Sequence, residues 1–216
     1  MNLILFGPPA AGKGTQADNL VKKFNLVKVS TGDLLRNEIQ KKSNLSIEIK
    51  TNIDKGILVS DNIINYLIEN ILSKQEYHNR LIFDGYPRNL NQIENLNTLL
   101  HKYNQKISCV LNLEIDKEII IKRVLGRKIC TKCGLIFNKY FKPANISTHK
   151  CDSKFLDKRS DDNEKTILKR IDTYLEKRIS VLNYYKDQKL LHQINGMREI
   201  DQIFQEIQSI IASLEA

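Results

Sequence analysis

A run of small residues near the start of the chain has the composition of a phosphate-binding loop. Leu3–Gln16 reads LILFGPPAAGKGTQ: an apolar run ends at Gly7, a glycine- and alanine-rich turn follows, and Lys13 opens a stretch with helical character. In such a loop, unpaired backbone N–H groups and the positive end of the helix dipole point at one place and bind an anion there. Lys13 adds a charge for the terminal phosphates of a nucleotide, and a neighbouring hydroxyl can ligate its magnesium ion. The sequence therefore predicts a nucleotide-binding site.

The loop departs by one position from the strict pattern G-x-x-x-x-G-K-[ST]. Gly14 stands where the hydroxyl belongs, and Thr15 comes next. Pro8 and Pro9 have no N–H group, so the useful amides should lie between residues 10 and 15. A chance glycine-rich turn is the weaker interpretation, because strand, loop and helix occur in the order that the motif requires.

Length and cysteine content narrow the class of protein. A chain of 216 residues suits one domain with insertions better than two independent domains. No early segment has the layout of a secretion signal, and no apolar run approaches the ~20 residues of a membrane span. We therefore expect a cytoplasmic protein without a membrane anchor. Its four cysteines are then more typical of metal ligands or core residues than of a disulfide framework.

The formal charge of +9 is less informative than the placement of the arginines. Lysine is scattered along a chain rich in Asn and Ile, and we interpret it mostly as coding bias and solvated surface. Most of the nine arginines lie beside turns or motif-like sequence. Because the planar fork of arginine binds phosphate oxygens two at a time, these residues together with one phosphate-binding loop indicate more than one phosphorylated ligand.

Strand and helix patterns alternate along most of the chain. Strands are expected at Leu3–Phe6, Val27–Val29, Leu81–Asp84, Ser108–Leu113 and Leu190–Ile194. Helices are expected at Lys13–Phe24, Leu34–Lys41, Asn62–Ser73, Leu90–Tyr103, Lys117–Leu125, Glu164–Lys186 and Ile200–Leu214. The alternation predicts an α/β fold with a doubly wound, parallel, five-stranded sheet that binds ligands at the carboxyl ends of its strands.

Two stretches interrupt this alternation and are predicted to be insertions over the active site. Residues 30–59 contain successive helical patterns without a strand, and residues 127–163 contain three of the cysteines. The core domain would then comprise residues 1–29, 60–126 and 164–216.

Further candidate site residues follow the predicted strands. Val29–Arg36 reads VSTGDLLR and offers a hydroxyl, a glycine turn, Asp33 as a helix cap, and an arginine, although a plain capped helix start would explain this segment equally well. FDGYPRNLNQ places Asp84 at a strand end, the usual position for the outer partner of nucleotide-bound magnesium. The segments at 122–128 and 158–170 flank the cysteine-containing stretch and supply Arg123, Arg127, Arg159 and Arg170.

Taken in order, these segments resemble the adenylate kinase family in its long, lid-bearing bacterial form. The resemblance is carried by GPPAAGKGTQA, STGDLLR, GILVSDNI, FDGYPRNLNQ, LGR, RSDDNE and ING. It implies a P-loop NTPase fold with a helical NMP-binding insertion and a zinc-type lid insertion. It also implies a magnesium-dependent enzyme that reversibly transfers the terminal phosphoryl group of ATP to AMP, giving two ADP. We expect a monomer that binds ATP, AMP and ADP and no nucleic acid.

The resemblance assigns individual residues to each part of the site. The ATP site would comprise Ala10, Ala11, Gly12, Lys13, Gly14 and Thr15, with Arg127, Ile136, Phe137 and Arg198 near the adenine. The AMP site would comprise Thr31, Arg36, Ile57, Leu58, Val59, Gly85, Tyr86, Pro87, Arg88, Gln92, Arg159 and Arg170, with Gln92 at the adenine edge. The catalytic groups would be Lys13, Asp84, Arg88, Arg123, Arg159 and Arg170.

One residue departs from the family's usual first loop, which reads G-x-P-G-x-G-K-G-T. Ala10 replaces the middle glycine. If this position needs a positive φ, Ala10 should cost stability or affinity; if it does not, little changes.

The cysteines between residues 127 and 163 have the spacing of a zinc site. Cys130-Thr131-Lys132-Cys133-Gly134 is a zinc-knuckle start, and Cys151 follows where a second ligand pair belongs. Many long-form members of the family carry a Cys-x-x-Cys or Cys-x-x-Asp pair there, whereas this chain has His149-Lys150-Cys151-Asp152. We prefer His149 as the fourth ligand, with Asp152 and Asp157 as alternatives and a metal-free lid as the competing interpretation. Cys109, inside an apolar strand, is expected to be a core residue.

Two other classes of protein remain as alternatives. One is a related kinase that acts on UMP, CMP or GMP, although Thr31 and Gln92 favour AMP. The other is a nucleic-acid-binding protein that combines the basic charge with a zinc knuckle. The chain has no aromatic stacking platform and no basic cluster, which speaks against this second class.

Overall fold

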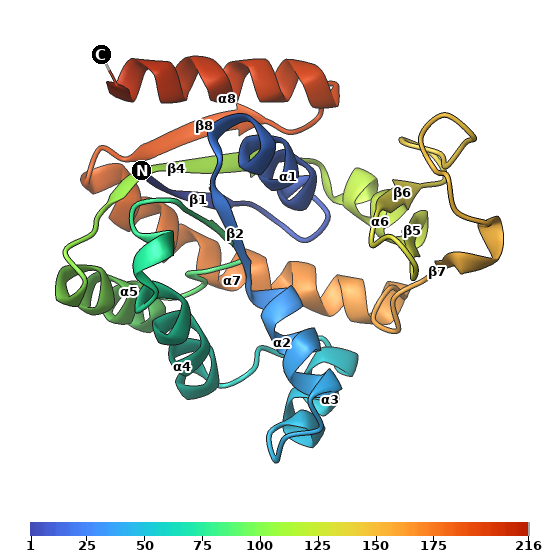
Figure 1. Cartoon of the computed structure of the whole chain (residues 1–216), viewed down its shortest axis with the longest axis horizontal. Coiled ribbons are helices and arrows are strands. Elements are labelled where there is room, and N and C mark those ends of the chain that lie inside the picture. The colour runs from blue at the N-terminus through green and yellow to red at the C-terminus, as the bar shows by residue number, and fades with distance from the viewer. Residues whose placement is uncertain (216) are drawn as a thin grey trace.

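A five-stranded parallel sheet forms the centre of the molecule in a computed structural model that describes residues 1–215 (Figure 1). In spatial order its strands are β2 (Val27–Ser30), β3 (Leu81–Asp84), β1 (Asn2–Phe6), β4 (Ile107–Glu114) and β8 (Leu191–Asn195). All five expected strands are present, and each end lies within one residue of its predicted position. The predicted parallel, doubly wound sheet is confirmed.

Helices cover both faces of this sheet. On one face lie α1 (Lys13–Phe24) and α8 (Ile200–Glu215), and on the other α4 (Asp61–Leu72), α5 (Leu90–Lys102) and α7 (Glu164–Asp187). The remaining helices are α2 (Thr31–Gln40), α3 (Ser46–Asp54) and α6 (Lys117–Leu125), with 3-10 turns η1 (Gln75–Tyr77) and η2 (Ser153–Phe155). None of the described helices combines the length and the apolar character that crossing a bilayer requires.

Alternate side chains of the central strand β1 pack into two different hydrophobic cores, one on each face of the sheet. Leu3 and Leu5 of β1 pack with apolar side chains of α1 and α8, whereas Ile4 and Phe6 pack with those of α4, α5 and α7. Successive side chains of a strand point to opposite faces, so a parallel strand covered on both faces is apolar throughout. This packing fixes the carboxyl end of β1, from which the phosphate-binding loop leaves.

The structure differs from the sequence-based expectation at the start of α2. This helix begins at Thr31 and not at Leu34, and Ser30 is its N-cap because the Ser30 hydroxyl accepts a hydrogen bond from the Asp33 N–H at 3.3 Å. The prediction that Asp33 caps the helix was wrong. The spacing Ser-x-x-Asp is the signature of a capping box and could have indicated the earlier start.

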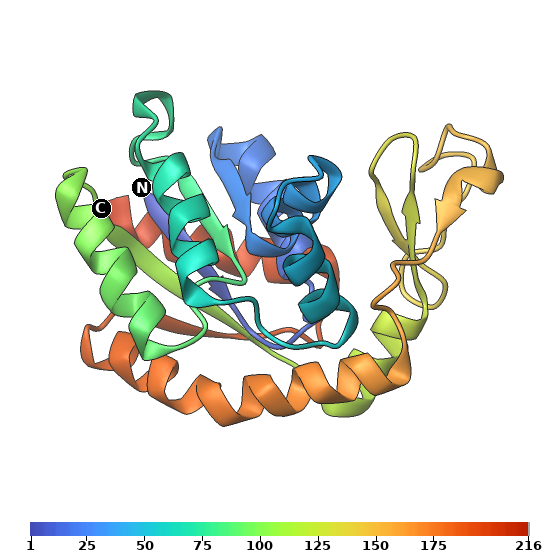
Figure 2. The same ribbon diagram turned by 90° about the horizontal axis from the view of Figure 1, so that it is seen from below.

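The stretch that contains three of the cysteines forms a second, smaller sheet. Its antiparallel strands are β5 (Arg127–Cys130), β6 (Ile136–Asn138) and β7 (Leu156–Asp157), in the order β6-β5-β7. Figure 2 shows this sheet standing apart from the main sheet, beyond the ends of α6 and α7. These strands were absent from the expected elements because two to four residues carry no readable alternation.

Candidate active site

The phosphate-binding loop, α2, the segment before α4, the turn after β3 and the small sheet surround one cavity of about 650 Å³. The predicted site residues that line it are Ala10, Ala11, Gly12, Lys13, Gly14, Thr15, Thr31, Arg36, Ile57, Leu58, Val59, Asp84, Gly85, Pro87, Arg88, Gln92, Arg123, Arg127, Ile136, Phe137, Arg159, Arg170 and Arg198. Tyr86 is the exception, because its side chain is buried in the core and its hydroxyl donates to the Gln92 carbonyl at 3.1 Å.

The backbone of the phosphate-binding loop turns sharply between β1 and α1. Gly7 has a φ of 139°, and a Cβ at this position would lie 2.6 Å from the Leu113 carbonyl oxygen. Gly12, the N-cap of α1, has a φ of 100°, and no side chain caps this helix. The N–H groups of its first turn are therefore available to an anion, as the sequence predicts.

Ala10 occupies the left-handed region with a φ of 59°, so its position does need a positive φ. For an L-residue this conformation costs about 1–2 kcal/mol, whereas glycine loses more chain entropy on folding. We expect Ala10→Gly to stabilise the protein by about 1 kcal/mol or less. Denaturant unfolding measures this change in the free energy of unfolding.

Ala11→Gly is the matched control for that change. Ala11 is buried and is not among the residues with positive φ, so this substitution should destabilise the protein. If both substitutions destabilise equally, Ala10 is not strained.

Lys13 reaches back over the loop and bonds to carbonyl oxygens. Its Nζ donates to the Gly7 oxygen at 2.9 Å and to the Pro8 oxygen at 2.7 Å. Burial lowers the pKa of Lys13 to about 8; Asp84 acts in the opposite direction, and the charges of Arg88 and Arg170 add to the lowering. Phosphate oxygens can replace the two carbonyls, and a negative ligand would restore the usual pKa.

Three of the predicted catalytic arginines face the cavity, and within residues 1–215 no acid is bonded to them. Arg88 donates from Nε to the Gly85 carbonyl at 2.6 Å, and Arg123 donates to the Ala11 carbonyl at 3.2 Å. The Nε of Arg159 is buried without a hydrogen-bond partner in the described part of the chain. Burial is the main cause that lowers the pKa of Arg88 and of Arg159, in each case to about 10. Buried cations of this kind are stabilised when an anion binds among them.

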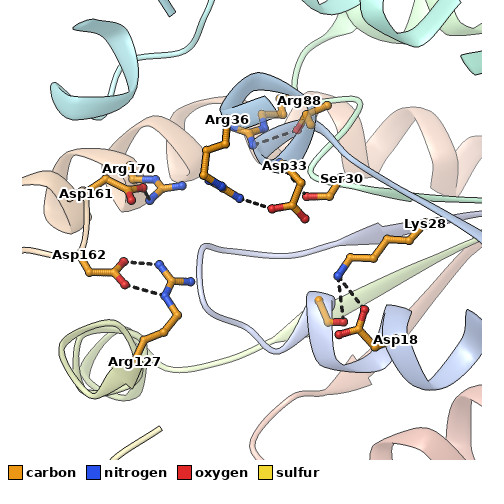
Figure 3. Close-up of polar contacts among 12 residues, drawn as sticks. Asp18, Lys28, Ser30, Asp33, Arg36, Arg88, Arg127, Asp161, Asp162 and Arg170 are labelled. Atoms are coloured by element: carbon orange, nitrogen blue, oxygen red, sulfur yellow. Dashed lines mark hydrogen bonds and ion pairs between the residues drawn. The ribbon is translucent and has the colours of Figure 1, made fainter. Parts of the chain in front are cut away.

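Three further arginines of the site are paired with acids (Figure 3). Arg36 donates to Asp33 at 2.5 Å, Arg170 donates to Asp161 at 2.7 Å, and Arg127 donates to Asp162 through Nε at 2.7 Å. Asp161 and Asp162 are buried, at 3% and 7% exposure. Both acids belong to the RSDDNE segment, but they were not predicted, because their role as arginine partners depends on contacts across the fold.

Lys28 also lines the cavity and was not predicted. Its Nζ donates to Asp18 at 2.9 Å and lies 3.4 Å from the Gly14 carbonyl oxygen (Figure 3). One lysine among many scattered lysines gives no sequence signal.

Gln92, Asp84 and Thr15 also line the cavity and offer polar groups for a base and for a divalent ion. The side-chain amide of Gln92 accepts from the Arg88 N–H at 2.7 Å and donates to Asp61 at 2.6 Å. Each end of an amide can make a second bond, so Gln92 retains one donor and one acceptor for a ligand. Asp84 has a carboxylate oxygen 3.7 Å from the position of a Cβ built on Gly14. Asp84 therefore lies beside the first turn of α1, where Thr15 follows Gly14, and this hydroxyl and carboxylate are suitable oxygen groups for Mg²⁺.

The small sheet and the segments around it gather the predicted metal ligands. The ligand atoms of Cys130, Cys133, His149 and Cys151 all lie within 4.8 Å of one another. Three thiols and one imidazole at this spacing fit tetrahedral Zn²⁺. Asp152 and Asp157, the alternative fourth ligands, are not in this cluster. Cys109 is buried in β4, which agrees with its expected place in the core.

The environment of this cluster favours metal binding. His149 is buried, and its Nε2 has no hydrogen-bond partner among the described residues. Burial alone would raise the pKa of Cys130, but the His149 ring and the backbone N–H groups of Cys133 and Lys132 lower it to about 6. An unpartnered buried nitrogen beside a thiol that ionises easily is suitable for a metal ion.

Comparisons with known proteins agree on one family. A family model described as adenylate kinase matches residues 5–190. The chain is 44% identical to the adenylate kinase of Pelagibacter ubique over 211 residues, which cover 98% of this chain and 99% of that protein. It is 36% identical to the adenylate kinase of Enterococcus faecalis, with 98% and 99% covered, and 38% identical to that of Clostridium botulinum, with 98% of each covered.

Proposed function

The chain belongs to the adenylate kinase family, and we propose that its cavity holds ATP and AMP together and moves the terminal phosphoryl group of ATP onto AMP. The reaction is reversible, requires magnesium and yields two ADP. The family match confirms the resemblance inferred from the sequence motifs. The observation that carries the proposal is the placement of one phosphate-binding loop and eight arginines around a single cavity.

The ATP phosphates occupy the loop from residue 10 to 15. Its N–H groups and Lys13 bind their oxygens, and Lys13 exchanges its bonds to the Gly7 and Pro8 carbonyls for bonds to the transferring group. The ATP base lies toward Arg127, Ile136, Phe137 and the backbone of Arg198, which line the same cavity.

AMP occupies the side of the cavity formed by α2 and the turn after β3. Thr31, Arg36, the backbone of residues 57–59, the 85–88 turn and Gln92 surround it. Gln92 binds the adenine edge with the donor and acceptor left free by Arg88 and Asp61. Tyr86 acts through its backbone, because its side chain is buried away from the cavity.

Transfer requires alignment and charge stabilisation more than covalent chemistry. Arg88, Arg123, Arg159 and Arg170 neutralise the charge that spreads over the transferring phosphoryl group, so no side-chain nucleophile is needed. Thr15 and Asp84 would hold the Mg²⁺, which neutralises phosphate charge when bound.

The two insertions exclude water from this chemistry. We assign residues 30–59 as the AMP-side insertion and residues 127–163 as the lid. Arg36 belongs to the first, and Arg127 and Arg159 belong to the second, so closure of both over the nucleotides brings their charges to the phosphates. A site that closed on ATP alone would hydrolyse it, which makes closure in response to both substrates useful.

We also propose that the lid binds structural zinc through Cys130, Cys133, His149 and Cys151. The zinc would hold the turns between the short strands, which have little core of their own. Replacing Cys130 and Cys133 by Ser should lower the melting temperature more than it lowers activity at moderate temperature. Differential scanning fluorimetry and elemental analysis of bound zinc measure the two effects.

The alternative acids serve as controls for the zinc site. Asp152→Asn and Asp157→Asn should leave one zinc per chain. An unchanged melting temperature in the cysteine variant, together with zinc-free wild-type protein, would favour a metal-free lid.

The pKa of Lys13 predicts a pH dependence for ATP. In the free enzyme the ammonium form dominates below pH 8 and is lost above it, because burial lowers the pKa to about 8. Phosphate binds the charged form, so kcat/KM for ATP should fall by about tenfold per pH unit above this pKa. A profile at saturating AMP, between about pH 6.5 and about pH 9.5, measures it. A flat profile would show that Lys13 remains charged throughout.

A panel of acceptors tests the substrate assignment. ADP formation from ATP and magnesium is measured with AMP, CMP, UMP, GMP or no monophosphate in parallel. AMP should be strongly preferred; preference for another monophosphate would keep the fold and mechanism but change the acceptor. We expect a monomer, since one chain completes the cavity. We also propose that the protein is cytoplasmic, because its cysteines are free thiols and the cytoplasm is reducing.

A further inference from the structure

A buried glutamine in the cavity wall has no role in the chemistry described above. Gln16 lies in the first turns of α1 and is 2% exposed. Its Nε2 donates to the Ile200 carbonyl oxygen at 2.9 Å, across 184 residues of sequence. Gln16 thus connects the helix that follows the phosphate-binding loop to the start of α8.

The turn that Gln16 holds forms one wall of the nucleotide cavity. Met197, Arg198, Glu199 and Ile200 all line the cavity. Within this turn the bonds are local: the Met197 N–H donates to the Asn195 side chain at 2.9 Å, and the Glu199 N–H donates to the Gln202 side chain at 3.3 Å. These local bonds shape the turn, but they do not fix its distance from the phosphate-binding loop.

Two side chains make the connection between the turn and the loop region. Arg123 donates to the Ala11 carbonyl at 3.2 Å and to the Gly196 carbonyl at 3.1 Å, and Gln16 binds the Ile200 carbonyl. Arg123 is expected to turn toward phosphate when nucleotides bind. Gln16, which is buried and belongs to α1, then remains as the side-chain link, beside the backbone bond from the Gly196 N–H to the Glu114 carbonyl at 2.8 Å.

If packing were its only role, a buried glutamine at position 16 would destabilise the folded state. The Gln16 Oε1 is buried with no hydrogen-bond partner in the described residues, and the neighbouring core of α1, α8 and β1 is apolar. A buried polar atom without a partner destabilises the folded state, so an apolar side chain would pack here at lower cost. The donor function of Gln16 therefore accounts for its presence.

We propose that Gln16 is a positioning residue for the donor nucleotide. It holds the backbone of residues 197–200 at a fixed distance from the phosphate-binding loop, so that the ATP base meets this turn while its phosphates lie in the loop. The inference rests on the proposed function, in which ATP spans these two sites. AMP lies on the other side of the cavity and does not depend on this link.

Replacing Gln16 by Met tests the proposal, because Met has a similar length and cannot donate. KM for ATP should rise by up to about tenfold, the equivalent of one lost hydrogen bond, while KM for AMP and kcat change by less than about twofold. A merely structural side chain would lower the melting temperature without separating the two KM values.

Gln105→Met is the matched control. Gln105 is also a buried glutamine, at 8% exposure, and also has one unpartnered amide atom, its Nε2. Its Oε1 accepts from Asn2 at 3.1 Å and from the Asn79 N–H at 2.9 Å, at the amino end of the sheet. This variant should lose stability while both KM values remain near those of the wild type.

A third variant covers the case in which Gln16→Met does not fold. Gln16→Asn keeps the amide but shortens the side chain by one methylene, so its amide lies farther from the Ile200 carbonyl, which Gln16 Nε2 meets at 2.9 Å. It should raise KM for ATP in the same direction by a smaller factor. The proposal is wrong if the folded variants keep the wild-type ratio of KM for ATP to KM for AMP. Wild-type enzyme that fails to transfer phosphate to AMP would instead overturn the proposed function.

Discussion

Replacing Lys13 by Met is expected to lower turnover by about three orders of magnitude while the fold persists. The Nζ of Lys13 is the only part of the side chain that bonds to the loop, through the Gly7 and Pro8 carbonyls. The aliphatic chain of Met fills the same space, but it places no charge on the transferring phosphoryl group. Since burial of the ammonium lowers its pKa, its removal also relieves a desolvation cost. Steady-state turnover should therefore be lost, while the melting temperature stays unchanged or rises.

Lys28→Met provides the control for that experiment. Lys28 lines the same cavity, but its ammonium is bound to Asp18 at 2.9 Å. Its loss should cost far less turnover than the loss of Lys13. Comparable turnover in the two variants would contradict the role given to Lys13.

Replacing Arg88 by Ala is expected to lower turnover by about two to three orders of magnitude. Its guanidinium is held in the cavity by the Gly85 carbonyl at 2.6 Å and lies 3.4 Å from the Thr31 hydroxyl. Burial and the charge of Arg170 lower its pKa, so the charged side chain destabilises the free enzyme. A phosphoryl group in transfer compensates that cost, so the loss should appear in kcat as well as in KM for AMP.

Arg80→Ala is the matched control. Arg80 also binds backbone carbonyls, donating to the Asn25 oxygen at 2.9 Å and 2.7 Å, but it is absent from the cavity lining. This variant should keep near-normal turnover and lose at most a little stability. If Arg80→Ala and Arg88→Ala reduced turnover equally, the effect would be on the fold and not on the transferring group.

The main sheet could be predicted almost to the residue because its information is local. The three central strands, β1, β3 and β4, are short, mostly apolar runs that end in a turn or a charge, because they are buried on both faces. The edge strands β2 and β8 are more polar, but each follows a turn. The small sheet could not be predicted in the same way. Its two- to four-residue strands lie among the candidate metal ligands, and β5 pairs with β7 through Ile129 with Asp157 and Cys130 with Leu156, which are far apart in the sequence.

In the candidate site, too, the residues that belong to local motifs could be predicted, and those that act through distant partners could not. The phosphate-binding loop and the arginines are recognisable because their residue types and spacing match a motif. Asp161, Asp162 and Gln16 were not singled out, because each acts through a partner that only the fold brings close. Ala10 shows the same limit. The sequence could not predict whether this position has a positive φ, and the structure shows a φ of 59°.

The stoichiometry of the reaction tests the central claim most directly. ATP consumed, ADP formed and inorganic phosphate released are measured together, with magnesium, in the presence and absence of AMP. If both nucleotides share the cavity and water is excluded, two ADP form for each ATP consumed, no inorganic phosphate appears, and omission of AMP stops the reaction. ADP and inorganic phosphate produced in equal amounts, at a rate that does not depend on AMP, would contradict the account.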